Sequence, residues 1–91
     1  FLINDYNQVD NDGHVRFIYS NPDNDNSSID IFDFAMDRVI QLGTSHLVNN
    51  NESEVIWNGR NEYGDQVANG VYFCRLSLNG EYYWTKLAVV N

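Results

Sequence analysis

Hydrophobic and polar residues alternate in short runs along this 91-residue chain, and turn-forming residues separate the runs. Between His14 and Ser20, for example, Val15, Phe17 and Tyr19 fall on one face, which is the pattern of a half-buried strand. Comparable runs predict strands at residues 28–34, 38–42, 54–57, 71–78 and 81–90, and residues 1–3 form a short apolar start. Because no window has sustained helical periodicity, about seven short antiparallel strands predict an all-β sandwich.

Turn signals mark the connections between these strands. Asn79-Gly80 stands between two strand runs and is the strongest short signal for a two-residue hairpin. Residues 35–37 are predicted to form a turn, and the polar residues 43–53 are predicted to form a loop.

A glycine-rich loop at residues 58–70 follows Trp57 and precedes the most hydrophobic strand run. Gly59, Gly64 and Gly70 can adopt positive φ angles without a steric penalty, so they predict a tightly folded, ordered loop. We expect Trp57 to close one end of the sandwich, with its indole N–H donated to a carbonyl of this loop.

The inward faces of the predicted strands define a candidate core. Its members are Val15, Phe17, Tyr19, Ile29, Ile31, Val55, Trp57, Tyr72, Cys74, Leu76 and Leu87. Cys74 shares a face with its neighbours at a spacing of two, which predicts a buried, unreactive thiol.

Composition narrows the class of protein. The formal net charge is −8 and the pI is near 4.3, so nucleic acid and anionic membrane surfaces are poor partners. No apolar run reaches the roughly 18 residues of a membrane helix, and we expect no membrane insertion. The length predicts one domain over residues 1–91, with residues 1–12 as an edge strand or a linker from a preceding domain. Because the chain begins at Phe1, we expect a processed product or a piece of a longer protein.

Catalytic chemistry is weakly supported by the residues present. His14 and His46 are the only histidines, and Ser45 beside His46 lies in no Gly-x-Ser-x-Gly motif. The many carboxylates stand in polar contexts that would not raise a pKa for acid catalysis. We therefore expect no enzyme activity and no cofactor.

Acidic residues in the turns offer weak calcium candidates. Asp10 and Asp12 are two residues apart, and an antiparallel pairing would bring Asp33 to the same end of the sheet. Turn formation by Asp and Asn side chains explains these positions without a metal, so we expect no metal site.

Two groups of hydrophobic residues are candidates for interaction. Phe1, Leu2 and Ile3 must pack either on their own sandwich or on a neighbour, because large apolar side chains are costly to leave in water. Tyr82 and Trp84 share one face of the last strand and could form a stacking platform for a sugar. We favour the alternative that packing covers these two rings.

Three segments resemble a known family. The first reads Trp57-Asn58-Gly59-Arg60-Asn61, Tyr63-Gly64 and Val67-Ala68-Asn69-Gly70-Val71-Tyr72-Phe73; the second reads Ile31-Phe32-Asp33-Phe34-Ala35-Met36-Asp37-Arg38-Val39; the third is the final Lys86-Leu87-Ala88-Val89-Val90-Asn91. They resemble the immunoglobulin-like domain of the flagellar hook-capping protein family and similar C-terminal domains of secreted bacterial proteins, including cargo of the type IX secretion system. Met36 stands where the family usually has glycine, and Asp37 stands where a basic residue is usual.

The resemblance covers residues 13–90 and implies an immunoglobulin-like β-sandwich. The family's structural motif corresponds here to Trp57, Gly59, Gly64, Gly70, Tyr72 and Phe73. Its implied role is that of a non-catalytic extracellular module at the C-terminal end of a secreted or surface bacterial protein, acting in export, sorting or attachment. The implied partners are proteins: the secretion machinery, a neighbouring domain or other copies of the chain.

Two alternatives for the function stay open. One is a structural subunit or terminal domain of an extracellular filament or cap that assembles through strand edges. The other, more distant, is a carbohydrate-binding module, for which a surface polysaccharide would be the partner.

Overall fold

The computed structural model describes residues 15–43, 46–47 and 51–90, and this part of the chain is all-β. Seven strands follow one another, and six of them are longer than the two residues of β4. Their bounds are β1 Val15–Ser20, β2 Ser27–Phe32, β3 Arg38–Leu42, β4 His46–Leu47, β5 Glu52–Trp57, β6 Gly70–Leu78 and β7 Glu81–Val89. Within the same residues, no helix is long and apolar enough to cross a membrane.

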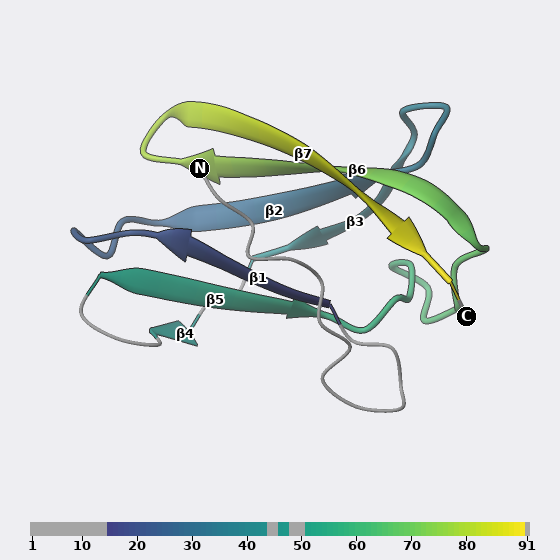
Figure 1. Ribbon diagram of the computed structural model, residues 1–91, viewed down its shortest axis with the longest axis horizontal. Helices are drawn as coiled ribbons and strands as arrows, with labels where there is room; N and C mark the ends of the chain where they lie inside the picture. The colour runs from purple at the N-terminus through teal and green to yellow at the C-terminus, as the bar shows by residue number, and fades with distance from the viewer. Residues whose placement is uncertain (1–14, 44–45, 48–50, 91) are drawn as a thin grey trace.

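The strands form two antiparallel sheets that pack as a small sandwich (Figure 1). One sheet has the order β3-β2-β6-β7 and the other has the order β1-β5-β4. The chain crosses between the sheets after β1, β3 and β5, which is the Greek-key arrangement of an immunoglobulin-like sandwich. The predicted fold class is therefore confirmed.

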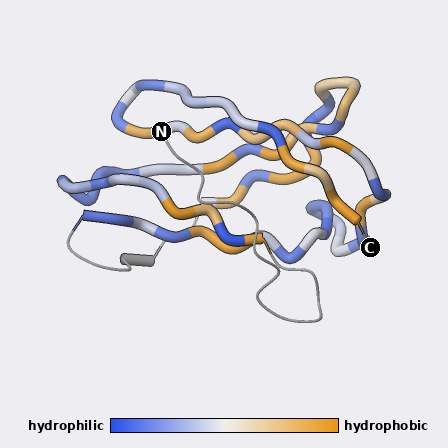
Figure 2. Tube along the Cα trace, viewed as in Figure 1, coloured by the Kyte–Doolittle hydropathy of each residue, from blue (hydrophilic) through white to orange (hydrophobic). Residues whose placement is uncertain are grey.

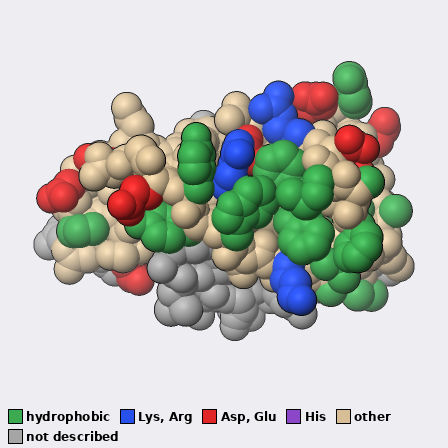
Figure 3. Space-filling view, turned by 90° about the horizontal axis from the view of Figure 1, so that it is seen from above, with side chains coloured by type: hydrophobic (Ala, Val, Ile, Leu, Met, Phe, Trp, Pro, Cys, Tyr) green, Lys and Arg blue, Asp and Glu red, His purple; other side chains and the backbone are tan. Residues whose placement is uncertain are grey.

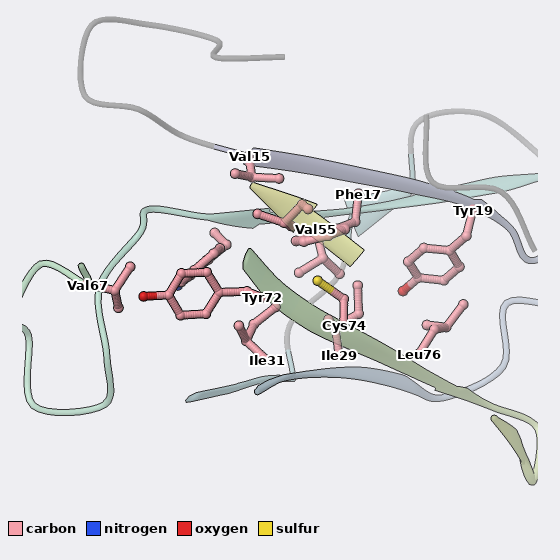
Figure 4. Close-up of a cluster of buried hydrophobic side chains, with 12 residues drawn as sticks. Val15, Phe17, Tyr19, Ile29, Ile31, Val55, Val67, Tyr72, Cys74 and Leu76 are labelled. Carbon is pink, nitrogen blue, oxygen red and sulfur yellow. The ribbon is translucent and has the colours of Figure 1, made fainter. Parts of the chain in front are cut away.

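Alternation along the strands directs one set of side chains into the space between the sheets. Figure 4 shows Val15, Phe17 and Tyr19 pointing from β1 toward side chains of the opposite sheet, such as Ile29 and Cys74. All eleven residues of the predicted core are buried, so that prediction is confirmed. The structure adds Val67, which lies in a loop where alternation gives no signal.

Hydrophobic positions follow the strands, whereas the turn between β1 and β2 is hydrophilic (Figure 2). Asn21 is the buried anchor of that turn. Its side-chain amide donates to the carbonyl of Asp25 at 3.0 Å and to the hydroxyl of Ser53 at 3.1 Å. The first bond closes the turn, and the second connects it to β5, which pairs with β1 in the same sheet.

The hairpin between β6 and β7 forms at the predicted Asn79-Gly80. Their φ angles of 51° and 79° are those of a type I′ turn, whose twist matches the twist of the flanking strands. This hairpin sets the register of β7, so that Leu78 pairs with Glu81 and Arg75 with Trp84.

Two predicted boundaries are wrong. The strand predicted at residues 28–34 ends at Phe32, because the Asp33 side chain accepts the backbone N–H groups of Ala35 and Asp37 at 3.0 and 2.9 Å and turns the chain. The loop predicted at residues 43–53 contains β4 and the first two residues of β5. Pairing with a neighbouring strand creates β4, and such tertiary pairing overrides the local preference of polar residues for loops.

The glycine-rich loop closes one end of the sandwich around Trp57 and Tyr72. The two rings meet edge to face, with centroids 5.9 Å apart, and the indole N–H of Trp57 donates to the carbonyl of Arg60 at 2.9 Å. The Tyr72 hydroxyl donates to the carbonyl of Ala68 at 2.6 Å. A tyrosine near the start of this strand that bonds back to the preceding loop is the tyrosine corner of immunoglobulin-like domains.

Positive φ angles allow the glycine-rich loop to fold back on itself. They are 78° at Gly59, 87° at Gly64 and 154° at Gly70. Asn61 adds two bonds from its side-chain oxygen, which accepts the N–H groups of Tyr63 and Asp65 at 2.9 and 3.0 Å. The indole N–H of Trp57 was predicted to donate to a carbonyl of this loop. The folded-back path of the loop brings the carbonyl of Arg60 to that position.

Candidate functional site

The outer face of the four-stranded sheet carries an unusual set of side chains for a solvent-facing surface. The register of β2, β6 and β7 places them in three cross-strand rows: Ser28, Ser77 and Tyr82; Asp30, Arg75 and Trp84; Phe32, Phe73 and Lys86. The first row carries hydroxyl groups, the second contains the Asp30–Arg75 ion pair, and the third is mainly aromatic. One end of the face is therefore polar and the other is largely apolar.

Four rings form what we call the aromatic cluster: Phe32, Phe34, Phe73 and Trp84. Phe32 and Trp84 have centroids 5.6 Å apart, and Phe34 stacks on Phe73 at 5.9 Å. Phe34 nevertheless stays 74% exposed and Trp84 50% exposed. In Figure 3, hydrophobic side chains gather into one group on this side of the molecule, with Lys and Arg side chains within and beside it.

Arg75 lies at the centre of the outer face and contacts three rings. Its guanidinium carbon lies 5.4 Å from the ring centroid of Phe32, 4.9 Å from that of Tyr82 and 5.7 Å from that of Trp84. A guanidinium over aromatic faces is attracted by their quadrupoles. Arg75 therefore holds the rings of β2 and β7 on either side of β6.

Asp30 lies beneath Arg75 and is 1% exposed. Its Oδ2 accepts a hydrogen bond of 2.8 Å from Nη2 of Arg75, while Oδ1 lies 3.9 Å from Nη1 of Arg38 and has no hydrogen-bond partner among the described residues. Asp30 is therefore buried, and its charged neighbours are the guanidinium groups of Arg75 and Arg38. The alternation of side chains along β2 places Asp30 on the outer face. Its burial there depends on the tertiary structure, which brings the side chain of Arg75 over it.

A shallow groove of about 310 Å³ crosses the polar end of the outer face. It runs from the start of β2 to the hairpin between β6 and β7. Its lining comprises Asn26, Ser27, Ser28, Ser77, Leu78, Asn79, Gly80, Glu81 and Tyr82. The lining includes side-chain hydroxyls, amides and one carboxylate, so the groove presents both donors and acceptors of hydrogen bonds beside apolar surface.

The predicted interaction residues have different outcomes. Tyr82 is 63% exposed and Trp84 is half-exposed on the outer face, so the preferred interpretation that packing covers both rings is wrong. The reason is that these rings lie on the face of the sheet turned away from the other sheet, and no further element among the described residues packs over that face. Phe1, Leu2 and Ile3 lie outside the described residues.

Of the weak calcium candidates, Asp33 is the one that lies in the described residues. Asp10 and Asp12 lie outside the described residues, and Asp33 uses its side chain to form the turn after β2. Among described residues, no three His, Cys, Asp or Glu side chains lie close enough to hold one metal ion.

The residues considered for catalysis supply no reactive group in the described region. His14 and Ser45 lie outside it, and so does the side chain of His46. Burial raises the pKa of the Cys74 thiol to about 12, so the thiol is a core group and not a nucleophile at neutral pH. The aromatic cluster and the groove are suited to binding. Comparisons with protein-family models, with curated proteins and with solved structures found no match.

Proposed function

We propose that this chain is a non-catalytic module of a secreted or cell-surface bacterial protein and that it attaches its host to a protein partner through the aromatic cluster. The exposed aromatic cluster is the observation that supports attachment. The resemblance of residues 57–73 and 31–39 to C-terminal modules of exported proteins supports the extracellular setting. The secretion machinery, a neighbouring domain and other copies of the chain are the candidate partners.

The chemistry of the cluster favours a protein as partner. Phe34 belongs to the turn after β2, and with Met36 it forms an exposed hydrophobic tip beside the face. Aromatic rings and arginine are enriched at the centre of protein interfaces, where their burial provides most of the binding free energy. Arg75 and Arg38 at this site suit a partner surface that carries acidic groups.

An export assay with matched variants tests this function. The chain is fused to the C-terminus of a secreted reporter in a bacterium that has a type IX system, and the reporter is measured in the cytoplasm, on the cell surface and in the medium. We expect the wild-type fusion to reach the surface and remain there. Phe34→Ser should release the reporter into the medium, because it removes an exposed ring of the cluster without opening the core.

The matched control is Tyr63→Ser, which removes an equally exposed ring from the glycine-rich loop. It should leave surface retention unchanged. A wild-type fusion that stays in the cytoplasm would overturn the export role, and equal retention of both variants would overturn the role of the cluster.

Filament or cap assembly is the second candidate, and β7 favours it. This strand has nine residues and pairs only with β6 among described residues, which leaves one long edge available for another strand. Sedimentation of the chain over a range of concentrations tests the idea. Assembly predicts a mass that grows with concentration, whereas a constant monomer mass would exclude it.

A further inference from the structure

We propose that the groove at the polar end of the outer face binds a neutral oligosaccharide. This site lies beyond the proposed attachment function, because it uses different residues from the exposed tip of the aromatic cluster. Three observations carry the inference: groove hydroxyl groups that make no hydrogen bond within the described residues, an exposed tyrosine ring fixed beside them, and no Lys or Arg among the described residues of the lining.

Ser28 and Ser77 supply the first observation. They are cross-strand neighbours on β2 and β6, and both residues line the groove. Within the described residues, neither side chain makes a hydrogen bond with the protein, whereas Ser27 bonds to Tyr19. A hydroxyl can donate one hydrogen bond and accept two, as can each hydroxyl of a sugar. The two serines are therefore available to a ligand that presents several hydroxyl groups.

Tyr82 supplies the second observation. It pairs with Ser77 across the sheet, and its ring is 63% exposed at the edge of the groove. Arg75 lies 4.9 Å from the centroid of this ring and contacts the ring of Trp84 as well, so both rings are held in place before a ligand arrives. The C–H face of a pyranose ring can stack on such an exposed aromatic ring while its hydroxyls reach the serines.

Charge and polarity supply the third observation. Among the described residues no Lys or Arg lines the groove, whereas the carboxylate of Glu81 does and accepts a hydrogen bond from the Tyr83 hydroxyl. Arg75, which contacts the ring of Tyr82, is paired with Asp30, and the whole chain has a net charge of −8, so the groove disfavours phosphate, sulfate and acidic sugars. Leu78 and the ring of Tyr82 are the hydrophobic side chains among the described lining residues, and the flat ring suits stacking against a sugar.

The size of the groove agrees with a short ligand segment. Its volume of about 310 Å³ lies at the lower end of the range for small-molecule sites, about 300–1,000 Å³. A groove open along one side admits a unit within a longer chain as well as a free end. A neutral polysaccharide is therefore as suitable a ligand as a free oligosaccharide.

Calorimetry with the whole chain tests the proposal. The probes are neutral hexasaccharides of glucose, in β-1,4 and α-1,4 linkage, of mannose and of xylose, with hexagalacturonate as the anionic counterpart. We expect at least one neutral probe to bind with a Kd of about 1 mM or tighter. Hexagalacturonate should bind at least tenfold more weakly than that probe.

Matched variants connect binding to the groove. Tyr82→Ala should weaken binding at least tenfold, while Tyr63→Ala, another exposed tyrosine, should leave it unchanged. If Tyr82→Ala fails to fold, the double variant Ser28→Ala with Ser77→Ala replaces it and should give the same loss. Phe34→Ser should retain sugar binding, which separates this proposal from the attachment function.

Three results would overturn the proposal: no neutral probe binds the wild-type chain, the anionic probe binds as tightly as the neutral ones, or a folded groove variant keeps wild-type affinity. Each of these outcomes leaves the export assay unaffected. Loss of surface retention in Phe34→Ser, with sugar binding intact, would support both sites independently.

Discussion

The hydroxyl of Tyr72 donates a hydrogen bond of 2.6 Å to the carbonyl oxygen of Ala68, four residues earlier in the chain. This bond ties the start of β6 to the loop that covers Trp57. Burial raises the pKa of Tyr72, and the carboxylate of Asp33 raises it further, so the hydroxyl keeps its proton and remains a donor at neutral pH. The hydroxyl of Tyr72 therefore acts together with the indole N–H of Trp57, which donates to Arg60, in holding the closed end of the sandwich.

Tyr72→Phe tests this relationship. The variant keeps the ring in the core and removes only the hydroxyl, which leaves the Ala68 carbonyl without its partner. We expect the free energy of unfolding in urea to fall by about 1–2 kcal/mol. Tyr63→Phe removes the hydroxyl of an exposed tyrosine and should change that free energy by less than about 0.5 kcal/mol. Equal stability of the two variants would show that the corner bond contributes nothing.

The ion pair of Asp30 and Arg75 predicts an asymmetry between two single variants. Arg75→Leu leaves the buried carboxylate of Asp30 without its close partner. In a fully buried pair such a loss lowers the free energy of unfolding by about 3–5 kcal/mol. Because Arg75 is partly exposed, we expect a loss of about 2–3 kcal/mol here. Asp30→Val leaves an arginine that water can still reach and should cost less.

The double variant Asp30→Val with Arg75→Leu should recover most of the stability that Arg75→Leu loses, because it no longer buries a charge. Urea unfolding of all four proteins completes the cycle. Additive losses, or a larger loss from Asp30→Val than from Arg75→Leu, would contradict this account of the pair.

Met36 predicts a stabilising substitution. Its φ angle is 67°, in the left-handed region where a side chain with a Cβ costs roughly 1–2 kcal/mol. Glycine avoids this cost. However, glycine also increases the conformational entropy of the unfolded chain, which lowers the free energy of unfolding by roughly 0.5–1 kcal/mol. We therefore expect Met36→Gly to raise the free energy of unfolding by about 0.5–1 kcal/mol.

Asn24→Gly is the matched control for Met36→Gly. Asn24 has a φ angle of 52°, but asparagine tolerates this region, so the exchange should give no gain in stability. A gain from Asn24→Gly as large as that from Met36→Gly would remove backbone strain as the explanation.

The buried thiol of Cys74 should make the folded state less stable at alkaline pH. Burial raises the thiol pKa from 9.0 to about 12, so the folded state holds its proton where the unfolded state releases it. The resulting stability is complete below pH 9 and is lost as the pH rises from 9 toward 12. Between pH 8 and pH 10.5, the free energy of unfolding should fall by about 2 kcal/mol more in the wild-type chain than in Cys74→Ala.

The comparison with Cys74→Ala isolates the thiol, because Tyr72 and Tyr83 also have raised pKa values and titrate in both proteins. Parallel pH profiles for the two proteins would contradict the assignment. Reaction of the folded wild-type thiol with a water-soluble disulfide reagent at pH 8 should also be slow, since only an opened state presents the sulfur.

Local patterns in the sequence were sufficient for six of the seven described strands, for the core except Val67, and for one hairpin. Alternation at a spacing of two assigns Phe17, Ile31 and Cys74 to the interior, since successive side chains on a strand point to opposite faces. Asn79-Gly80 sets the last hairpin because both residues accept positive φ angles. These features depend on residues that are close together in the sequence, so they can be predicted from the sequence alone.

The outer face depended on which strands become neighbours in the sheet. Asp30 and Arg75 are 45 residues apart in the sequence. Only the pairing of β2 with β6 places the side chain of Arg75 over that of Asp30. The same pairing, together with the hairpin at β7, assembles Ser28, Ser77 and Tyr82 into one groove. Alternation distinguishes the inside of a strand from its outside, but it does not specify the strand beside it, because cross-strand contacts arise only when the sheet forms.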